Sequence, residues 1–313
     1  MVKRQLGQYY TEGNPFTLRP FLAWAKKIGL NNKHVLEPFA GANNIIRGLQ
    51  SLGFAQQFTS FDIVPTDPAV VFRDTIKDFP QGFELCITNP PWLAKNSAHR
   101  RGLLFPDTPH DDLYKHALQL CLDNCKYVAA LIPATFLRSG IFHDRLDTVI
   151  FLHDQRMFLD TENPVCLALF RTASHQVKVF HDNEFIGALN ELETKLPQPT
   201  QRIHISFNHP SGSLGFVAFD NTREPSIRFM KGSQLKNYTV GFTSRMVTRI
   251  GGRFHNLDSL IDNLNADIDK FRKETKDVFL TPFKGLRKDG HYRRRMDYRL
   301  ARDFIAKYAH THS

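Results

Sequence analysis

Asparagine, two prolines and tryptophan, Asn89 to Trp92, close the apolar run FELCIT (83–88), and their types and order could do chemistry. The side-chain oxygen of Asn89 and the backbone carbonyl of Pro90 can each accept one hydrogen of an amine, which would orient its nitrogen lone pair. Pro90 and Pro91 rigidify the loop, and Trp92 offers a stacking face. Asn89 is a neutral amide and cannot act as a general base. A plain turn is the alternative, because Asn-Pro favours turn initiation.

Two acidic residues have the spacing of a nucleoside site. In VLEPFAGANNII (35–46) a strand pattern ends in Glu37 and is followed by Gly41 and a helix pattern, as in turns that hold a nucleoside at the carboxyl ends of strands. The single glycine disfavours a pyrophosphate site, which needs Gly-x-Gly-x-x-Gly. Asp62 ends a second strand pattern, where a carboxylate can accept hydrogen bonds from ribose hydroxyls. An ordinary turn and a helix-capping aspartate are the plainer alternatives.

A family resemblance joins these motifs. The order of GQYYT (7–11), EPFAG (37–41), Asp62, Asp74 and NPPW (89–92) resembles the gamma-type adenine-N6 DNA methyltransferases, which use S-adenosyl-L-methionine. The resemblance covers about residues 7–171. It implies that Asn89 and Pro90 hold the adenine amine, that Pro91 fixes the loop, and that Trp92 stacks on a base flipped out of duplex DNA.

The resemblance also implies the cofactor contacts: Tyr10, Thr11, Glu37, Phe39, Gly41, Asp62 and Asp74. Tyr10 and Thr11 would line the methionine end of the cofactor, and Asp74 would accept a bond from its adenine amine, with Asp78 as the alternative. Phe158 is implied as a second residue that stacks on the base, and a core phenylalanine is its alternative. Asn43 stands where family members often have a second glycine, and asparagine tolerates a left-handed backbone.

Positive charge is concentrated near the end of the chain. Residues 223–313 hold 20 Lys and Arg against 10 Asp and Glu, so they carry the whole net charge of +10. Such a basic part typically meets a polyanion, and double-stranded DNA is the expected partner; a solvated surface is the alternative. The candidate DNA contacts are Arg245, Arg249, Arg253, Arg293, Arg294 and Arg295. The first three recur every four residues, in a helix or in a loop beside Gly251 and Gly252, whereas the last three are consecutive and cannot share one face.

An α/β fold would position these residues. Apolar runs that leave room for helices between them predict a doubly wound, mostly parallel sheet, the Rossmann-like methyltransferase fold that the resemblance implies. The runs are 34–39, 58–64, 83–89, 127–133, 149–153 and 166–171, and helices are predicted over 16–29, 113–126 and 257–271. Loop-like stretches mark a boundary between roughly residues 175 and 200 and predict two domains, a catalytic domain over 1–180 and a smaller target-recognition domain over 181–313.

Composition limits the remaining possibilities. With 42% hydrophobic and 23% charged residues, the chain belongs with globular proteins. No apolar run approaches the roughly 20 residues that span a bilayer, and the N-terminal residues lack a signal-peptide pattern, so a cytoplasmic protein without membrane contact is expected. The four cysteines are expected as buried thiols, and no His or Cys spacing predicts a metal.

Other functions stay open. RNA adenine-N6 and protein glutamine-N5 methyltransferases share the Asn-Pro-Pro-aromatic motif, because an amide nitrogen and an adenine amine pose the same lone-pair problem. A non-catalytic nucleic-acid-binding protein is the third alternative. A monomer is expected, with a possible cognate restriction endonuclease linked by function rather than by contact.

Overall fold

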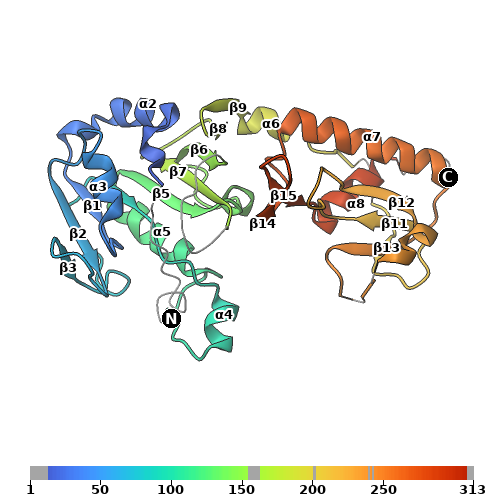
Figure 1. The fold of residues 1–313 in the computed structure, drawn as a ribbon, viewed down its shortest axis with the longest axis horizontal. Coiled ribbons are helices and arrows are strands. Elements are labelled where there is room, and N and C mark those ends of the chain that lie inside the picture. The colour runs from blue at the N-terminus through green and yellow to red at the C-terminus, as the bar shows by residue number, and fades with distance from the viewer. Residues whose placement is uncertain (1–12, 154–162, 200–201, 239, 242, 309–313) are drawn as a thin grey trace. The chain divides into compact units, whose positions relative to one another are not determined.

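The chain folds into two compact units. The computed structural model describes residues 13–153, 163–199, 202–238, 240, 241 and 243–308. The units are Met1–Leu189 and Asn190–Ser313. A nine-stranded sheet belongs to the first unit, and a four-stranded and a two-stranded sheet belong to the second (Figure 1).

The first unit alternates strands and helices. Its strands are β1 (Val35–Glu37), β2 (Phe58–Asp62), β3 (Val70–Phe72), β4 (Leu85–Thr88), β5 (Tyr127–Pro133), β6 (Leu146–Leu152), β7 (Val165–Phe170), β8 (Lys178–His181) and β9 (Glu184–Ala188). Its helices are η1 (Pro15–Thr17), α2 (Arg19–Ile28), η2 (Leu30–Asn32), α3 (Asn44–Gln50), α4 (Lys95–Arg100), α5 (Leu113–Asn124) and η3 (Phe136–Ser139). The short helix α6 (Leu189–Glu193) lies at the division between the units.

The sheet has the strand order β3-β2-β1-β4-β5-β7-β6-β8-β9. Every pair from β3 to β5 is parallel, β7 is antiparallel to both β5 and β6, β8 is parallel to β6, and β9 is antiparallel to β8. The order 3-2-1-4-5 is that of doubly wound nucleotide-binding sheets. The predicted α/β fold class with a mostly parallel sheet is confirmed.

Helices α3 and α5 lie on opposite faces of this sheet, because the chain moves in opposite directions after β1 and β4 and both crossovers are right-handed. On one face, α2 and α3 share a core cluster with the β4 residues Leu85 and Ile87. On the other face, the Sγ of Cys86 lies 3.7 Å from the Sγ of Cys121 in α5. Alternate β4 side chains therefore pack into the cores on the two faces of the sheet, which explains the continuous apolar pattern of this strand.

In the first unit the predicted strands are present, and three short ones were missed, whereas no strand was predicted in the second unit. Strand β3 is only three residues long and lies at one end of the sheet, and although all three residues are apolar, Val71 and Phe72 are exposed. Its short apolar run therefore did not stand out in the sequence. Strands β8 and β9 complete the opposite end with a polar, mixed pattern. Because β9 pairs with β8, the first compact unit extends to Leu189.

The second unit packs a long helix on a small antiparallel sheet. Its elements are β10 (Ser206–Phe207), β11 (Leu214–Val217), β12 (Arg228–Lys231), η4 (Gly232–Asn237), β13 (Val247–Gly251), α7 (Leu257–Thr275), β14 (Thr281–Leu286), β15 (Tyr292–Arg295) and α8 (Tyr298–Ala306). The four-stranded sheet has the order β10-β13-β11-β12. Helix α7 runs alongside β12 (Figure 1) and buries the apolar stripe that the sequence predicted, including Leu264, Ile268 and Phe271.

A buried ion cluster joins α7 to the two-stranded sheet. The Asp220 carboxylate, fully buried, accepts hydrogen bonds from Arg272 at 2.7 and 2.9 Å and from Arg287 at 2.8 Å. Burial alone would raise the pKa of Asp220, but the hydrogen bonds and charge of Arg272 outweigh it and the pKa is lowered. Asp220 is therefore held as an anion, which ties together segments more than 50 residues apart in sequence.

Candidate functional site

The carboxyl ends of β1 and β4 form the point where the strand order of the first sheet reverses. These two strands are neighbours, and the chain leaves β1 toward β2 but leaves β4 toward β5. In open α/β sheets a ligand binds in the crevice outside the strands at this switch point. Glu37 is the last residue of β1, and Asn89 directly follows the last residue of β4. The topology thus brings the two predicted motifs to one edge.

Glu37 connects the two motifs directly. Its Oε1 accepts a hydrogen bond from the Thr88 hydroxyl at 2.6 Å and from the Phe39 backbone N–H at 3.0 Å. Its Oε2 is buried and has no hydrogen-bond partner among the described residues. Burial raises the pKa of Glu37 from 4.5 to about 8, against the lowering effect of the Thr88 bond. The sequence did not single out Thr88, because nothing local marks a partner 51 residues away.

The turn after β1 is fastened to the end of β2. The Gly41 backbone N–H donates to Asp62 Oδ2 at 2.8 Å, and the Val64 N–H donates to Asp62 Oδ1 at 2.7 Å. Asn43 has a φ of 60°, the left-handed conformation that the sequence required of it, and its Oδ1 accepts a bond from the Ser60 hydroxyl at 2.8 Å. These two backbone donors fix the position of the Asp62 carboxylate at the end of β2.

The segment after β3 approaches the same turn. The buried Thr75 donates its hydroxyl hydrogen to the Pro38 carbonyl at 2.8 Å, which brings the adjacent Asp74 near the Glu37–Gly41 turn. Asp74 is half-buried and pairs with Lys77 at 3.1 Å, whereas the side chain of Asp78 is 76% exposed and pairs with Arg73. Asp74 is thus held next to the turn while Asp78 faces solvent, and the role of either residue stays a prediction.

The loop Asn89–Trp92 is anchored at its far end by a residue that the sequence did not reveal. Asp112 accepts a hydrogen bond from the Leu93 N–H at 3.2 Å and caps α5 through the Tyr114 N–H at 3.3 Å. Burial raises the pKa of Asp112 to about 6. Asn89, Pro91 and Trp92 are half-buried, Pro90 is buried, and Trp92 packs partly against the core cluster of α2 and α3. Its stacking role stays a prediction.

Three predicted site residues lie outside the described residues. They are Tyr10 and Thr11, for the methionine end of the cofactor, and Phe158, for the flipped base.

The candidate DNA contacts of the 245–253 segment lie on and beside a strand rather than a helix. Arg249 belongs to β13, and the exposed Arg245 and Arg253 lie just before and after that strand. The helical alternative is wrong, because Val247 and Ile250 pair with Val217 and Leu214 of β11 in the sheet. Only Arg249 lies within the strand, so the alternation of side chains along β13 fixes the direction of this arginine alone.

The three consecutive arginines of β15 have different surroundings. Arg294 is only 4% exposed, and burial lowers its pKa to about 10. Arg293 is half-buried, and its guanidinium lies over the rings of Phe219 and Phe283. Arg295 is half-buried as well. The inward orientation of Arg294 leaves Arg293 and Arg295 as the DNA candidates of this strand.

Neither metal nor membrane features occur in what the structure describes. No group of three or more His, Cys, Asp or Glu side chains among the described residues is arranged to hold a metal ion. No helix in the described ranges is long and apolar enough to cross a membrane. All four cysteines are free and buried.

Comparisons with known proteins returned distant structural neighbours. A protein described as a class I S-adenosylmethionine-dependent methyltransferase from Listeria monocytogenes is 13% identical over 52% of this chain and 64% of its own, with a TM-score of 0.39. The methyltransferase subunit of a type I restriction-modification system from Streptococcus thermophilus is 15% identical over 58% and 52%, with a TM-score of 0.36. A DrdV–DNA complex is 13% identical over 58% and 28%, with a TM-score of 0.43.

The chain thus spans between 28% and 64% of the length of these three neighbours. No protein-family model matches the sequence, and no curated protein matches it.

Proposed function

We propose that the protein transfers a methyl group from S-adenosyl-L-methionine to the N6 amine of an adenine in duplex DNA. The observation that carries this proposal is the hydrogen bond from Thr88 to Glu37 at the switch point of the sheet. It joins the acidic turn, which would bind the cofactor, to the strand end that presents Asn89 and Pro90. A donor site and an acceptor site for one transfer reaction therefore share a rigid edge.

The residues at the β1 turn fit a cationic nucleoside cofactor. S-adenosylmethionine would supply an electrophilic methyl group on a positively charged sulfur. Glu37 offers a buried carboxyl oxygen without a partner among the described residues, and a nearby cation would draw it into its charged form. Asp62 would accept the ribose hydroxyls and Asp74 the adenine amine, with Phe39 and Gly41 lining the turn and Tyr10 and Thr11 the methionine end.

Asn89 and Pro90 would prepare the amine by hydrogen bonding. The lone pair of an adenine exocyclic amine is delocalised into the ring, so the amine is a poor nucleophile. When Asn89 Oδ1 and the Pro90 carbonyl each accept one amine hydrogen, the nitrogen can pyramidalise and direct its lone pair away from both acceptors. Acceptors fixed before the reaction cost no reorganisation in the transition state. Trp92 would hold the ring by stacking, with Phe158 as the predicted second face.

Duplex DNA is favoured as the substrate by the basic second unit. The target base must leave the stack to reach the crevice, at a cost of a few kcal/mol. Residues 223–313 carry the entire excess of positive charge, which suits contacts with phosphates on both sides of a flipped base. A monomer would suffice for such a reaction, and a cognate restriction endonuclease would act separately on the same site.

Labelled cofactor tests the reaction and the substrate class together. The full chain is incubated with methyl-labelled S-adenosylmethionine and, separately, with duplex DNA, ribosomal RNA and protein extract, and the products are digested to nucleosides or amino acids. N6-methyladenine from DNA is expected. Label in RNA adenine or in protein glutamine would establish one of the two alternative transferases, and cofactor binding without label in any substrate would favour a non-catalytic binding protein.

A variant pair tests the role of Asn89. Asn89→Ala should abolish methyl transfer while cofactor binding stays close to that of the wild type. The matched control is Asn96→Ala, at an exposed asparagine of α4, which should keep both properties. Wild-type turnover of Asn89→Ala would refute the hydrogen-bonding mechanism.

A further inference from the structure

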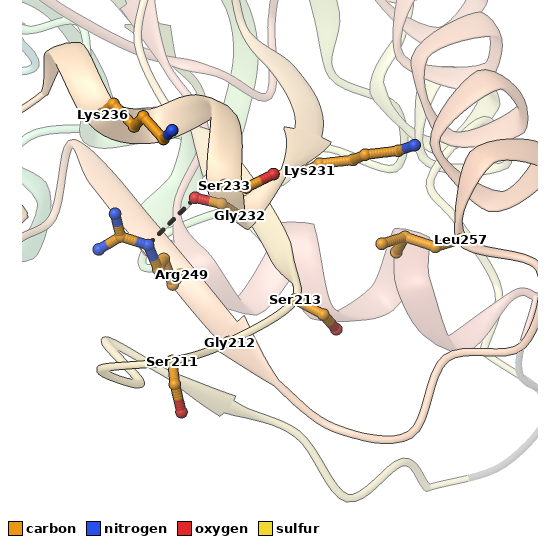
Figure 2. Close-up of a pocket in the computed structure, with 9 residues that line it drawn as sticks. All are labelled: Ser211, Gly212, Ser213, Lys231, Gly232, Ser233, Lys236, Arg249 and Leu257. Atoms are coloured by element: carbon orange, nitrogen blue, oxygen red, sulfur yellow. Dashed lines mark hydrogen bonds between the residues drawn. The ribbon is translucent and has the colours of Figure 1, made fainter.

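A hollow of about 460 Å³ lies in the second unit, between η4 and the ends of the antiparallel strands (Figure 2). Its size falls within the roughly 300–1,000 Å³ of typical ligand sites. Three basic residues, three serines and two glycines line it together with Leu257, and none of these nine residues is acidic. A positively charged, hydroxyl-rich lining suits an anion.

The floor of the hollow is backbone. A Cβ at Gly212 would lie 2.5 Å from the backbone of Ile250, and a Cβ at Gly232 would overlap the Gly212 carbonyl oxygen. The Gly232 N–H donates to the Ser213 carbonyl at 2.6 Å, which closes the two turns on each other. Glycine at both positions thus lets the two turns pack directly against neighbouring backbone, which holds the lining of the hollow in place.

The Arg249 side chain is held in place by one hydrogen bond. Its Nε donates to the Gly232 carbonyl at 3.1 Å, as drawn in Figure 2, and this bond leaves both terminal guanidinium nitrogens available. Gly215 lies directly opposite Arg249 across β11 and β13, and the Leu235 side chain packs against it, because a Cβ at Gly215 would lie 3.0 Å from Leu235. No carboxylate lies within ion-pair distance of Arg249 among the described residues. A fixed, uncompensated guanidinium is the group that binds phosphate best.

Two lysines add charge on either side of the glycine pair. Figure 2 shows Lys236 on the same side of Gly232 as Arg249 and Lys231 on the other side. Lys236 is exposed and forms no ion pair with a described residue, whereas Lys231 pairs with Asp258 at 2.7 Å. Lys236 and Arg249 therefore supply the uncompensated charge of the hollow.

The serines complete the lining. Ser211, Ser213 and Ser233 are exposed, and their hydroxyls donate to no other described residue. Hydroxyls beside cations are common phosphate ligands in nucleic-acid interfaces, where they fix the position of the backbone without specifying sequence.

We propose that this hollow is a phosphate site that binds the sugar-phosphate backbone of duplex DNA through Arg249 and Lys236, with the three serine hydroxyls as additional donors. The inference rests on the proposed function for its choice of DNA as the source of the phosphate. It assigns a role to Lys236 and the serines, which sequence patterns did not mark, and it makes Arg249 a backbone contact rather than a reader of bases.

The salt dependence of DNA affinity tests the site in the full chain. Each phosphate that a cation neutralises in a duplex contributes about 0.9 to the slope of log affinity against log salt. Lys236→Ala and Arg249→Ala should each reduce this slope by about 1 and weaken binding to all duplex sequences alike. Lys236→Arg should restore the slope. The matched control is Lys273→Ala, at an exposed lysine of α7 outside the hollow, which should leave it unchanged.

Two further measurements identify the phosphate source and separate this proposal from the enzymatic one. Inorganic phosphate is titrated at constant ionic strength by calorimetry, and methylation of DNA is measured on the same preparations. If the salt slopes of Lys236→Ala and Arg249→Ala equal the wild-type slope, the proposal is overturned. If these variants lose binding of inorganic phosphate while their DNA slopes stay unchanged, the hollow is a site for free phosphate instead. The Lys236 side chain forms no hydrogen bond or ion pair with a described residue, so Lys236→Ala removes no such contact within the chain. If DNA is methylated but the salt slopes of the variants are unchanged, the proposed enzymatic function is supported and only the proposed phosphate site is refuted.

Discussion

The protonation of Glu37 should control how the stability of the first unit varies with pH. Burial raises the pKa of this carboxyl from 4.5 to about 8, so the folded protein holds its proton where the unfolded chain releases it. Stability from this group is complete below pH 4.5 and is lost as the pH rises toward 8. At about 1.36 kcal/mol per pH unit, the loss over this interval approaches roughly 5 kcal/mol.

Glu37→Gln should remove this dependence, because the amide does not titrate. Its carbonyl can still accept the bonds from Thr88 and Phe39, while the buried amide nitrogen adds an offset that does not vary with pH. The difference in unfolding free energy between the two proteins should therefore shift steadily in favour of the variant from pH 5 to pH 8.

Urea unfolding followed by tryptophan fluorescence measures this difference in the relevant unit alone. The chain has two tryptophans, Trp24 and Trp92, and both belong to Met1–Leu189. Glu184→Gln makes the same change at an exposed carboxyl of that unit and should reproduce the wild-type profile. Parallel pH profiles for Glu37→Gln and the wild type would refute the assignment of a buried, protonated Glu37.

Three further outcomes are expected. Binding of the cationic cofactor at pH 7 should release close to one proton, because the cation lowers the pKa of Glu37; calorimetry in buffers of different ionisation enthalpy should show this release, and Glu37→Gln should show none. Thr88→Val should destabilise the first unit by about 1–3 kcal/mol and slow methyl transfer, with Thr88→Ser restoring both, and a fully active valine variant would contradict its positioning role. Arg272→Ala should destabilise the second unit by roughly 3–5 kcal/mol, because the buried Asp220 carboxylate loses one of its two arginine partners and keeps only Arg287. The loss should appear as a circular-dichroism transition that tryptophan fluorescence does not follow, and exposed Arg223→Ala is the control.

Strands buried on both faces could be predicted because every residue in them is apolar, as in β5 and β7. Edge strands could not, since β3 exposes Val71 and Phe72 and needs only one partner. The segment containing Arg249 shows the opposite failure. An arginine at every fourth residue suits a helix as well as a strand. Only the cross-strand pairs decide between them, because Arg249 lies opposite Gly215 and Thr248 lies opposite Phe216 in the sheet.

The candidate site divides in a similar way. Glu37, Gly41, Asp62 and Asn89 could be named because local motifs and strand ends mark them. Thr88, Asp112 and Lys236 could not, because their roles come from partners or surroundings that are remote in sequence. Asn43 stands between these two groups. The family often has glycine at this position, and Asn43 adopts the left-handed backbone conformation that a glycine would allow.

The antiparallel insertion of β7 between β5 and β6 has a consequence for the nascent chain. Strand β5 ends at Pro133, but β7, which covers its outer edge, begins only at Val165, and β6 has no place in the sheet until β7 arrives. At roughly 5–20 residues per second, a ribosome would leave the apolar β5 edge uncovered for about 2–6 s. A mutation that delays the β6–β7 hairpin should therefore lower the yield of soluble protein during synthesis more than it lowers the stability of the finished fold.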